Sequence, residues 1–322
     1  MASVAEAQPV KSNREAAWSQ AVAALIMVAL LIGAPFVLYP VFLMKALCFA
    51  LFACAFNLLI GYVGLVSFGH ALYFGWASYL SAYAAKSWGL PPEISILIGT
   101  ATAAALGLIA GSLAIRRQGI YFAMITLALA QMMYLVALRV KLTGGEDGIQ
   151  AVPRGRLFGV FDLSHEMTMY VFVLVVVLAG FFLIYRIINS PFGEVLRAIR
   201  ENEQRAISLG YKTDRYKLIA FVLSATLTGL AGSVKAFVFQ LASLTDVHWT
   251  MSGEVVLMTL VGGLGTIFGP FVGAFVVIAL ENYLAPFGQW VLVIQGAIFV
   301  ICVLVFRRGI IGELADVLHV KL

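Results

Sequence analysis

The sequence predicts an all-α protein: a polytopic membrane helix bundle of about ten spans, some of them interrupted by glycine and proline. Of its 322 residues, 62% are hydrophobic and 11% are charged, whereas a soluble chain carries about 25% charged residues. Apolar runs recur along the chain, and each membrane-spanning helix needs roughly 20 such residues. A membrane barrel would need alternating strands of ~10 residues, which the sequence lacks. The net charge of +5 is modest, so nucleic acid is not an expected partner.

The apolar runs define the spans in order. Residues 1–20 are polar and are interpreted as a cytoplasmic N-terminal arm. The run 21–38 is long for a signal peptide and is followed by no small-x-small cleavage site. Trp18 and Tyr39 bracket it as interfacial anchors, so we expect it to be retained as the first span. The other expected spans are residues 41–62, 65–85, 94–115, 120–139, 168–188, 216–241, 253–268, 271–284 and 289–306.

The distribution of lysine and arginine favours ten spans over nine. With ten spans and the N-terminus inside, 14 of the 21 Lys and Arg residues are cytoplasmic, half of them within 186–217. Merging residues 253–284 into one interrupted span gives 11 against 10, which is almost no bias. Because cytoplasmic loops are enriched in these residues, we expect a transmembrane domain at 21–306, a cytoplasmic tail at 307–322 and both termini in the cytoplasm.

The segment 189–217 is the one long, highly charged stretch between spans, and the charge count makes it a cytoplasmic loop. Ser190 is suited to cap a helix that begins at Pro191. From 194 to 209 the apolar residues return on one helical face, which predicts an amphipathic helix on the membrane surface. These residues are Val195, Ile199, Ala206 and Leu209.

Two further features support this helix. Glu201 stands four residues before Arg205, the order that favours an ion pair. Gly210 is placed to end the helix. The alternative is a solvated loop that only satisfies the charge rule.

The segment 141–167 is then an external loop. Gly144, Gly145 and Gly148 tolerate positive φ, which is typical of turns. The loop carries both signs of charge. It is either a docking site for a soluble binding protein or an ordered lid without a specific partner.

Two glycine-rich stretches, 61–75 and 262–273, interrupt the apolar runs. Glycine and proline allow a helix to unwind, and irregular backbone at membrane depth survives only where protein or a water-lined cavity satisfies it. The stretches fall at roughly matching places in two halves of five spans, which is typical of a translocation path. The candidate path residues are Asn57, Gly64, Ser67, Gly69, His70, Gly262, Gly263 and Gly265.

Close helix packing is the alternative role for these glycines, and it is compatible with a path. Gly265, Gly269 and Gly273 repeat every four residues, which is the small-residue pattern of helix association. Gly107 and Gly111 repeat in the same way and are assigned to packing alone.

The sequence contains no motif for enzymatic chemistry. It lacks the phosphate loop G-x-x-x-x-G-K-[ST], the zinc motif H-E-x-x-H and the nucleophile motif G-x-S-x-G. The four histidines are scattered and form no ligand set. We therefore expect no catalytic residues and no metal site, and the chain is predicted not to be an enzyme.

Charged residues within or near the spans are few. Lys45 and Lys235 lie near span ends and are expected to extend toward the interface. Acidic residues lie almost wholly in loops or at span ends, with Glu254 and Glu281 as the nearest exceptions. A transporter driven by protons or sodium would need ionisable relays at mid-membrane, so this class is disfavoured.

The segment SPFGEVLRAIRENEQRAISLGYKTDRYK resembles the coupling segment of LivM-type permeases in bacterial branched-chain amino acid ABC importers. The likeness covers roughly residues 49–306, including NLLIGYVGLVSFGHALYFG and LVGGLGTIFGPFVGA. The family usually has two alanines where Arg205 and Ala206 stand here. The matching positions are Gly193, Leu196, Ala198, Ile199, Arg200, Glu201, Glu203, Ala206, Gly210 and Lys217.

The resemblance implies a permease subunit in the bacterial inner membrane that forms the translocation path but binds no cofactor. It implies a paralogous permease partner, two cytoplasmic ATPase subunits that hold ATP and Mg, and a periplasmic or lipid-anchored binding protein. The implied substrates are Leu, Ile or Val, with urea, small amides or other amino acids as alternatives. The implied ATPase-coupling residues, among which the charged ones set docking and Ile199 is the anchor, are Gly193, Leu196, Arg197, Ile199, Arg200, Glu201, Glu203, Ala206 and Gly210.

Overall fold

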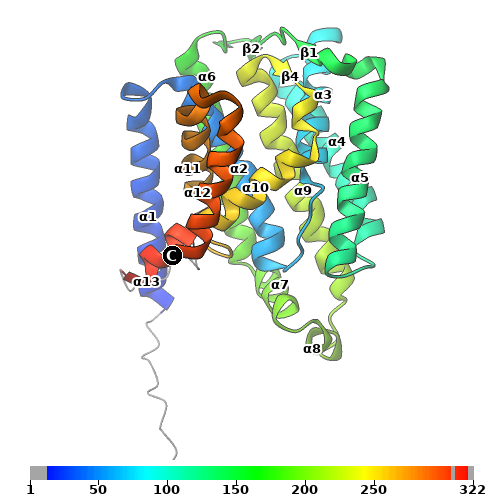
Figure 1. Ribbon diagram of the computed structural model, residues 1–322, viewed down its shortest axis with the longest axis vertical. Coiled ribbons are helices and arrows are strands. Elements are labelled where there is room, and N and C mark those ends of the chain that lie inside the picture. The colour runs from blue at the N-terminus through cyan, green and yellow to red at the C-terminus, as the bar shows by residue number, and fades with distance from the viewer. Residues whose placement is uncertain (1–12, 306–308, 318–322) are drawn as a thin grey trace, which may run out of the picture.

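The computed structural model describes residues 13–305 and 309–317, which form a helix bundle with short strands at one end (Figure 1). The α-helices are α1 (Asn13–Gly33), α2 (Pro40–Tyr62), α3 (His70–Ser87), α4 (Pro92–Ala114), α5 (Ile120–Arg139), α6 (Glu166–Ile188), α7 (Pro191–Glu201), α8 (Glu203–Ser208), α9 (Thr213–Phe239), α10 (Trp249–Gly262), α11 (Gly269–Leu284), α12 (Val291–Val305) and α13 (Gly309–Val317). The strands are β1 (Ile149–Gln150), β2 (Arg156–Leu157), β3 (Phe161–Asp162) and β4 (Leu241–Ala242).

Five helices of the described residues are long and apolar enough to cross a membrane: α2, α4, α5, α6 and α9. The apolar stretch Val22–Phe36 and helix α11 are shorter. The predicted span 120–139 coincides with α5, and the start of α9 lies three residues before the predicted 216. These helices confirm a polytopic helical membrane protein, while the count of ten stays a prediction.

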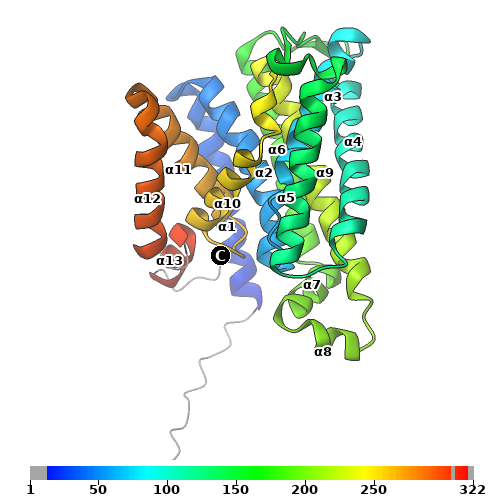
Figure 2. The same ribbon diagram turned by 45° about the vertical axis from the view of Figure 1, so that its right-hand side comes forward.

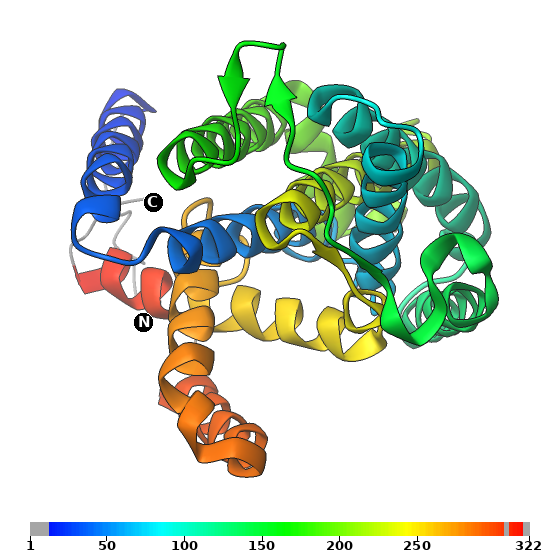
Figure 3. The ribbon, with the colours of Figure 1, turned by 90° about the horizontal axis from the view of Figure 1, so that it is seen from above.

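Helix α2 forms the centre of the bundle. In its membrane-spanning window 89% of the residues are buried, more than in any other of the five long helices. It packs against α6 and α9 and against α10 and α11; viewed from above, it lies between α6 on one side and the α10–α11 pair on the other (Figure 3). A movement of any of these helices would therefore change its packing contacts with α2.

Small residues bring α4 and α9 together. A Cβ at Gly107 would lie 2.6 Å from the Cβ of Ala225, and one at Gly111 would lie 2.9 Å from the ring of Phe221. Backbones approach this closely only where side chains are absent. The packing role predicted for these two glycines fits the structure.

Both glycine-rich stretches leave the helical conformation. Helix α2 ends at Tyr62 and α3 begins at His70, so the helix of the predicted span 65–85 starts five residues later than expected. The second interruption separates α10 from α11. Gly64 (φ 81°) and Gly263 (φ 125°) have backbone angles that side chains disfavour. Helix α10 has 14 residues, about 21 Å of helix, and does not cover the ~30 Å hydrocarbon core.

The charged loop contains two helices, so the prediction of one helix over 194–209 is wrong. Asn202 has extended backbone angles (φ −157°, ψ 98°), and its side chain caps α8 by accepting from the N–H of Arg205. Because this break falls between Glu201 and Arg205, the expected ion pair between them does not form among the described residues.

The predicted ends of the charged segment are confirmed. The Ser190 hydroxyl accepts a hydrogen bond from the N–H of Gly193, and Pro191 is the first residue of α7. At the other end Gly210 takes a φ of 89°, and its N–H donates to the carbonyl of Ile207 over 2.9 Å.

Helices α7 and α8 lie at the same end of the bundle as the start of α1 and as α13 (Figures 1 and 2). The strands lie at the opposite end. There β1 pairs antiparallel with β4, which ties the loop after α5 to the end of α9, and β2 pairs with β3. Residues 1–12 of the predicted arm, residue 306 of the predicted last span, and residues 307–308 and 318–322 of the predicted tail lie outside the described residues.

Candidate functional site

The two interruptions meet each other beside the end of α2. The side-chain amide of Asn57 donates to the carbonyl of Thr266 over 2.9 Å, and its oxygen accepts from the N–H of Gly265 over 3.1 Å. A Cβ at Gly61 would lie 2.3 Å from that oxygen and 2.9 Å from the nitrogen of Gly265. Asn57 is 2% exposed, so its buried amide has its partners within the protein, as a costly polar group at this depth requires.

Arg200 of α7 enters the same place. Its Nη1 donates to the carbonyl of Gly61. Its Cγ lies 3.1 Å from the position that a Cβ of Gly64 would occupy, and its Nη1 lies 3.3 Å from the corresponding position at Gly265. One side chain of the charged loop thus contacts both interruptions. We call Asn57, Gly61, Gly64, Arg200, Gly265 and Thr266 the break junction.

The inner face of α7 and α8 is buried in this chain. Leu196 is 0% and Ile199 is 3% exposed, and a Cβ at Gly193 would lie 2.1 Å from the carbonyl oxygen of Ile188. Ala206 is buried as well. Ile199 therefore packs against the bundle, and its side chain is not presented to a partner as expected.

Glu203 also faces this chain. It forms an ion pair with the buried Lys217 and accepts a hydrogen bond from the side-chain amide of Gln118 over 2.8 Å. The expected docking role of this carboxylate does not fit these contacts. They tie the start of α8 to α9 and to the residues before α5.

The outer face of α7 and α8 mixes charges with apolar side chains. Glu201 and Arg205 are exposed, and three apolar residues of the segment after the Asn202 break are exposed with them. They are Ile207 (47% exposed), Leu209 (72%) and Tyr211 (41%). The sequence pattern placed Leu209 on the apolar face of the predicted surface helix and indicated no role for the other two.

The charges of α7 also reach α2. The guanidinium of Arg197 lies over the ring of Tyr62, 5.4 Å from its centroid, and forms an ion pair with Glu194 over 2.8 Å. A cation over an aromatic face is attracted to it. The last residue of α2 is thus held by α7.

The first interruption encloses His70, which is fully buried. Its Nδ1 lies 3.0 Å from the hydroxyl of Ser67 and its Nε2 lies 2.9 Å from that of Ser224. Ser224 donates onward to the carbonyl of Ala55 over 2.6 Å, so it accepts from Nε2–H and the imidazole is the neutral Nε2 tautomer. His70 and Ser67 are 0% exposed, and a Cβ at Gly69 would lie 2.7 Å from the carbonyl of Thr126.

The second interruption packs against the end of the chain. A Cβ at Gly262 would lie 1.9 Å from the carbonyl of Gly269, and one at Gly309 would lie 2.4 Å from the Cα of Gly263. The turn between α10 and α11 is thus in backbone contact with the start of α13. The lack of a side chain at Gly309 permits this close approach, and the lack of one at Gly262 permits the tight turn.

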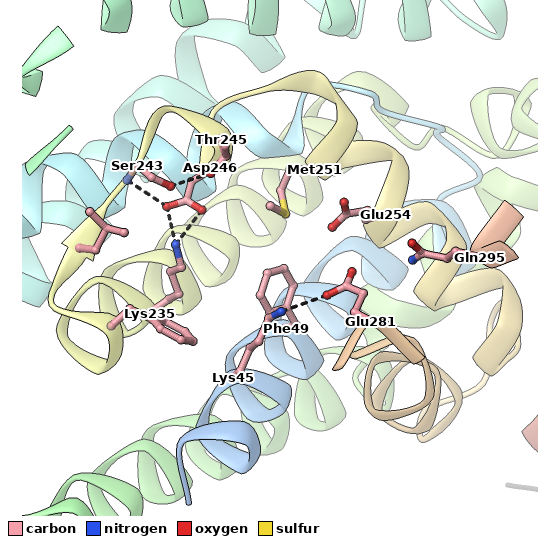
Figure 4. Close-up of a pocket in the computed structure, with 12 residues that line it drawn as sticks. Lys45, Phe49, Lys235, Ser243, Thr245, Asp246, Met251, Glu254, Glu281 and Gln295 are labelled. Atoms are coloured by element: carbon pink, nitrogen blue, oxygen red, sulfur yellow. Dashed lines mark hydrogen bonds and ion pairs between the residues drawn. The ribbon is translucent and has the colours of Figure 1, made fainter. Parts of the chain in front are cut away.

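A pocket of about 480 Å³ lies at the other end of α2 (Figure 4). Residues of α2, α9, α10, α11 and α12 and of the segment after β4 line it. Lys45 of this pocket and Tyr62 beside α7 are 17 residues apart on α2, about 25 Å at 1.5 Å per residue. Among residues 13–305 and 309–317, no three His, Cys, Asp or Glu residues gather as a metal-binding group.

Two ion pairs lie in this pocket, and the burial of Lys235 overturns the expectation that this lysine extends toward the interface. Lys235 is 8% exposed and donates to both carboxylate oxygens of Asp246, over 2.7 and 2.6 Å. Lys45 donates to Glu281 over 3.0 Å. Both ammonium groups pair inside the protein, because carboxylates from other elements are within reach. No sequence pattern predicted these pairs, because the two members of each pair lie on different elements.

The sequence matches the protein family described as "Branched-chain amino acid transport system / permease component" over residues 39–303. It is 25% identical over 288 residues to the high-affinity branched-chain amino acid transport system permease protein LivM of Escherichia coli (strain K12), with 82% of this chain and 68% of that protein covered.

Two further relatives are similar over about half of the chain. A probable branched-chain amino acid transport permease protein LivH of Methanocaldococcus jannaschii is 28% identical, with 48% of this chain and 51% of that protein covered. The ribose import permease protein RbsC of Bacillus subtilis (strain 168) is 29% identical, with 51% of each chain covered. No solved structure matches.

Proposed function

Because the chain belongs to the family of permease components of branched-chain amino acid transport systems, we propose that it is one transmembrane subunit of an ATP-binding-cassette importer for such amino acids. It lies in the inner membrane of a bacterium. It has ten membrane segments within 21–306, of which α10 is too short to cover the hydrocarbon core by itself, and an external loop at 141–167. Both termini and the loop 189–217 lie in the cytoplasm. The position of α7 and α8 at the same end of the bundle as the start of α1 and as α13 supports this topology (Figure 1).

The observation that carries this function is the contact of Arg200 with Gly61, Gly64 and Gly265 of the break junction. The outer face of α7 and α8 binds in a groove of a cytoplasmic ATPase subunit, where Leu209 and Ile207 are covered. When the ATPases close on ATP, α7 moves and Arg200 moves with it. Because Arg200 holds Gly61 and lies against Gly64 and Gly265, the motion reaches both interruptions at once.

The coupling residues divide into two groups. Gly193, Leu196, Ile199 and Ala206 attach α7 and α8 to the bundle, as does the ion pair of Glu203. Arg197 and Arg200 connect α7 with α2, and Gly210 ends α8. Glu201, together with the exposed apolar residues, faces the ATPase.

The candidate path residues act as the moving parts of the gate. Asn57 joins the two interruptions, while Ser67, Gly69 and His70 fix the start of α3 and Gly262, Gly263 and Gly265 form the turn after α10. In this enclosed arrangement they close the inner end of the path. Rearrangement of unwound segments is the usual way in which such bundles open.

The partners follow from this role. A second homologous permease pairs with this chain, two ATPase subunits hold ATP and Mg, and a periplasmic or lipid-anchored protein delivers the solute. Similarity to relatives named LivM and LivH supports a pair of unlike permeases. Similarity to a ribose import permease keeps a different small solute as the second candidate, including other amino acids, urea or small amides.

Uptake in proteoliposomes tests this proposal. The chain is co-expressed with its neighbouring transport subunits, and uptake of radiolabelled L-leucine is measured with ATP or its non-hydrolysable analogue inside. Uptake that requires hydrolysable ATP and all subunits is the expected result. Uptake by the chain alone under a proton or sodium gradient would instead establish an ion-coupled secondary transporter.

A further inference from the structure

The pocket at the outer end of α2 contains an unbalanced set of charges. Its lining includes two ammonium groups, of Lys45 and Lys235, and three carboxylates, of Asp246, Glu254 and Glu281. Two ion pairs account for four of these groups. Glu254 of α10 is half-buried and, among the described residues, forms no ion pair. A half-buried carboxylate without an ion-pair partner is costly to ionise, so Glu254 favours a ligand that brings a positive charge.

The two ion pairs differ in whether the ammonium group can still bind a ligand. Lys235 and Asp246 are joined by two hydrogen bonds, and the N–H of Ser243 also donates to this carboxylate over 3.3 Å. The side chain of Lys45, in contrast, is 35% exposed and its ammonium makes one hydrogen bond, to Glu281. An ammonium has three N–H groups, so Lys45 can donate to a further acceptor in the pocket.

From this geometry we propose that the pocket holds the transported solute and selects a zwitterionic amino acid with an apolar side chain. The ammonium of the solute pairs with Glu254, and its carboxylate accepts from Lys45. The charges then alternate from Glu254 through the solute to Lys45 and Glu281. The inference rests on the proposed function and adds to it the place and the charge of the substrate.

The rest of the lining suits the side chain of such a solute. Phe49 lies between the two groups of charges, and Met251 lies above them (Figure 4). Phe239 and Leu241 add further apolar surface. The volume of about 480 Å³ lies within the range of small-molecule sites. These four apolar residues, among the twelve that line the pocket, give the side chain of the solute an apolar surface to pack against.

Charge separates this proposal from its rivals. An anion would meet a pocket with one surplus negative charge. A neutral amide would leave Glu254 without a counter-charge. A cation would satisfy Glu254 but would leave the free N–H groups of Lys45 without an acceptor.

Protection of an introduced cysteine tests the site itself. Met251→Cys is made together with Cys302→Ser, since the other two cysteines, Cys48 and Cys54, are buried. The whole transporter without its binding protein is labelled with a maleimide in the presence of one of three probes. L-leucine is zwitterionic, 3-methylbutylamine is a cation without a carboxylate or carbonyl, and 4-methylpentanoate is an anion, and all three carry the same isobutyl group.

We expect L-leucine to slow labelling at least fivefold and the other two probes to have little effect. Equal protection by all three, or protection by none, would overturn the proposal. A cysteine that reacts only after removal of the second permease would identify the pocket as a subunit interface and would overturn it as well. Protection by 3-methylbutylamine alone would assign a cation site and would overturn the proposal.

Transport by pocket variants separates this inference from the proposed function. Glu254→Gln should reduce ATP-driven leucine uptake at least tenfold, Glu254→Asp should restore part of it, and ATP hydrolysis by the complex should persist. The matched control is Glu166→Gln, an exposed carboxylate in the first turn of α6. Normal uptake by Glu254→Gln would refute the pocket alone, whereas the absence of ATP-driven uptake in the unaltered complex would refute the proposed function.

Discussion

Arg200 and Gly61 are 139 residues apart in the sequence, yet the guanidinium of Arg200 donates to the carbonyl of Gly61. The hydrogen bond joins the first helix of the charged loop to the last turn of the most buried helix. The same side chain lies against Gly64 and Gly265. A movement of α7 therefore cannot leave the two glycine-rich interruptions unchanged.

Replacement of Arg200 by Met should uncouple transport. Loss of a hydrogen bond to a charged group costs about 1.5–3 kcal/mol, so α7 would move without carrying Gly61 with it. ATP hydrolysis should persist while leucine uptake falls about tenfold or more. Both rates are measured in the same proteoliposomes.

The control for this variant is Arg186→Met, which removes an exposed arginine from the last turn of α6. It should transport at the normal rate. Equal losses of uptake and hydrolysis in Arg200→Met, or none, would show that this arginine does not transmit the motion.

Replacement of Gly61 by Ala should destabilise the protein. The added methyl group would lie 2.3 Å from the side-chain oxygen of Asn57, which holds the second interruption. Overpacking of this kind costs typically 1–3 kcal/mol. The variant should unfold at a lower temperature than the parent in thermal size-exclusion measurements. Gly33→Ala adds its methyl group in open space and should unfold at the parental temperature; a similar drop in both would contradict the argument.

The sequence predicted correctly those helices that depend only on a local run of apolar residues. The run at 120–139 predicted α5 to the residue because apolar content alone decides such a helix. At Asn202 the helical periodicity continues through a break. The break depends on a side-chain cap, for which Asn followed by Glu was the available signal. No local pattern indicates that Lys235 meets Asp246 across a helix end, because that contact depends on tertiary packing.

The pair of Lys235 and Asp246 should contribute to stability only as a pair. Asp246→Asn leaves a nearly buried ammonium without its counter-charge, which costs about 3–5 kcal/mol. The combination with Lys235→Met removes both charges and should recover much of the loss. Thermal unfolding of the four proteins in the cycle measures the coupling. If the double variant is as unstable as the sum of the single variants, the two side chains do not interact.

The exposed apolar residues of the charged loop should form the contact with the ATPase. Leu209 is 72% exposed beside charges, and such a residue costs little in the free chain but contributes apolar burial when a partner covers it. Leu209→Asp should therefore leave the thermal stability of the permease unchanged and reduce co-purification of the ATPase subunit at least fivefold.

The matched control lies at the other end of the molecule. Phe158 is equally exposed, at 72%, and lies between β2 and β3. Its φ of 50° is a backbone angle that Asp tolerates better than most residues. Phe158→Asp should retain the ATPase fully. If both variants lose the ATPase, the effect reflects damage to the fold; if neither does, the apolar residues after Asn202 are not the docking surface, and α7 must receive its force through Glu201 and its charged neighbours.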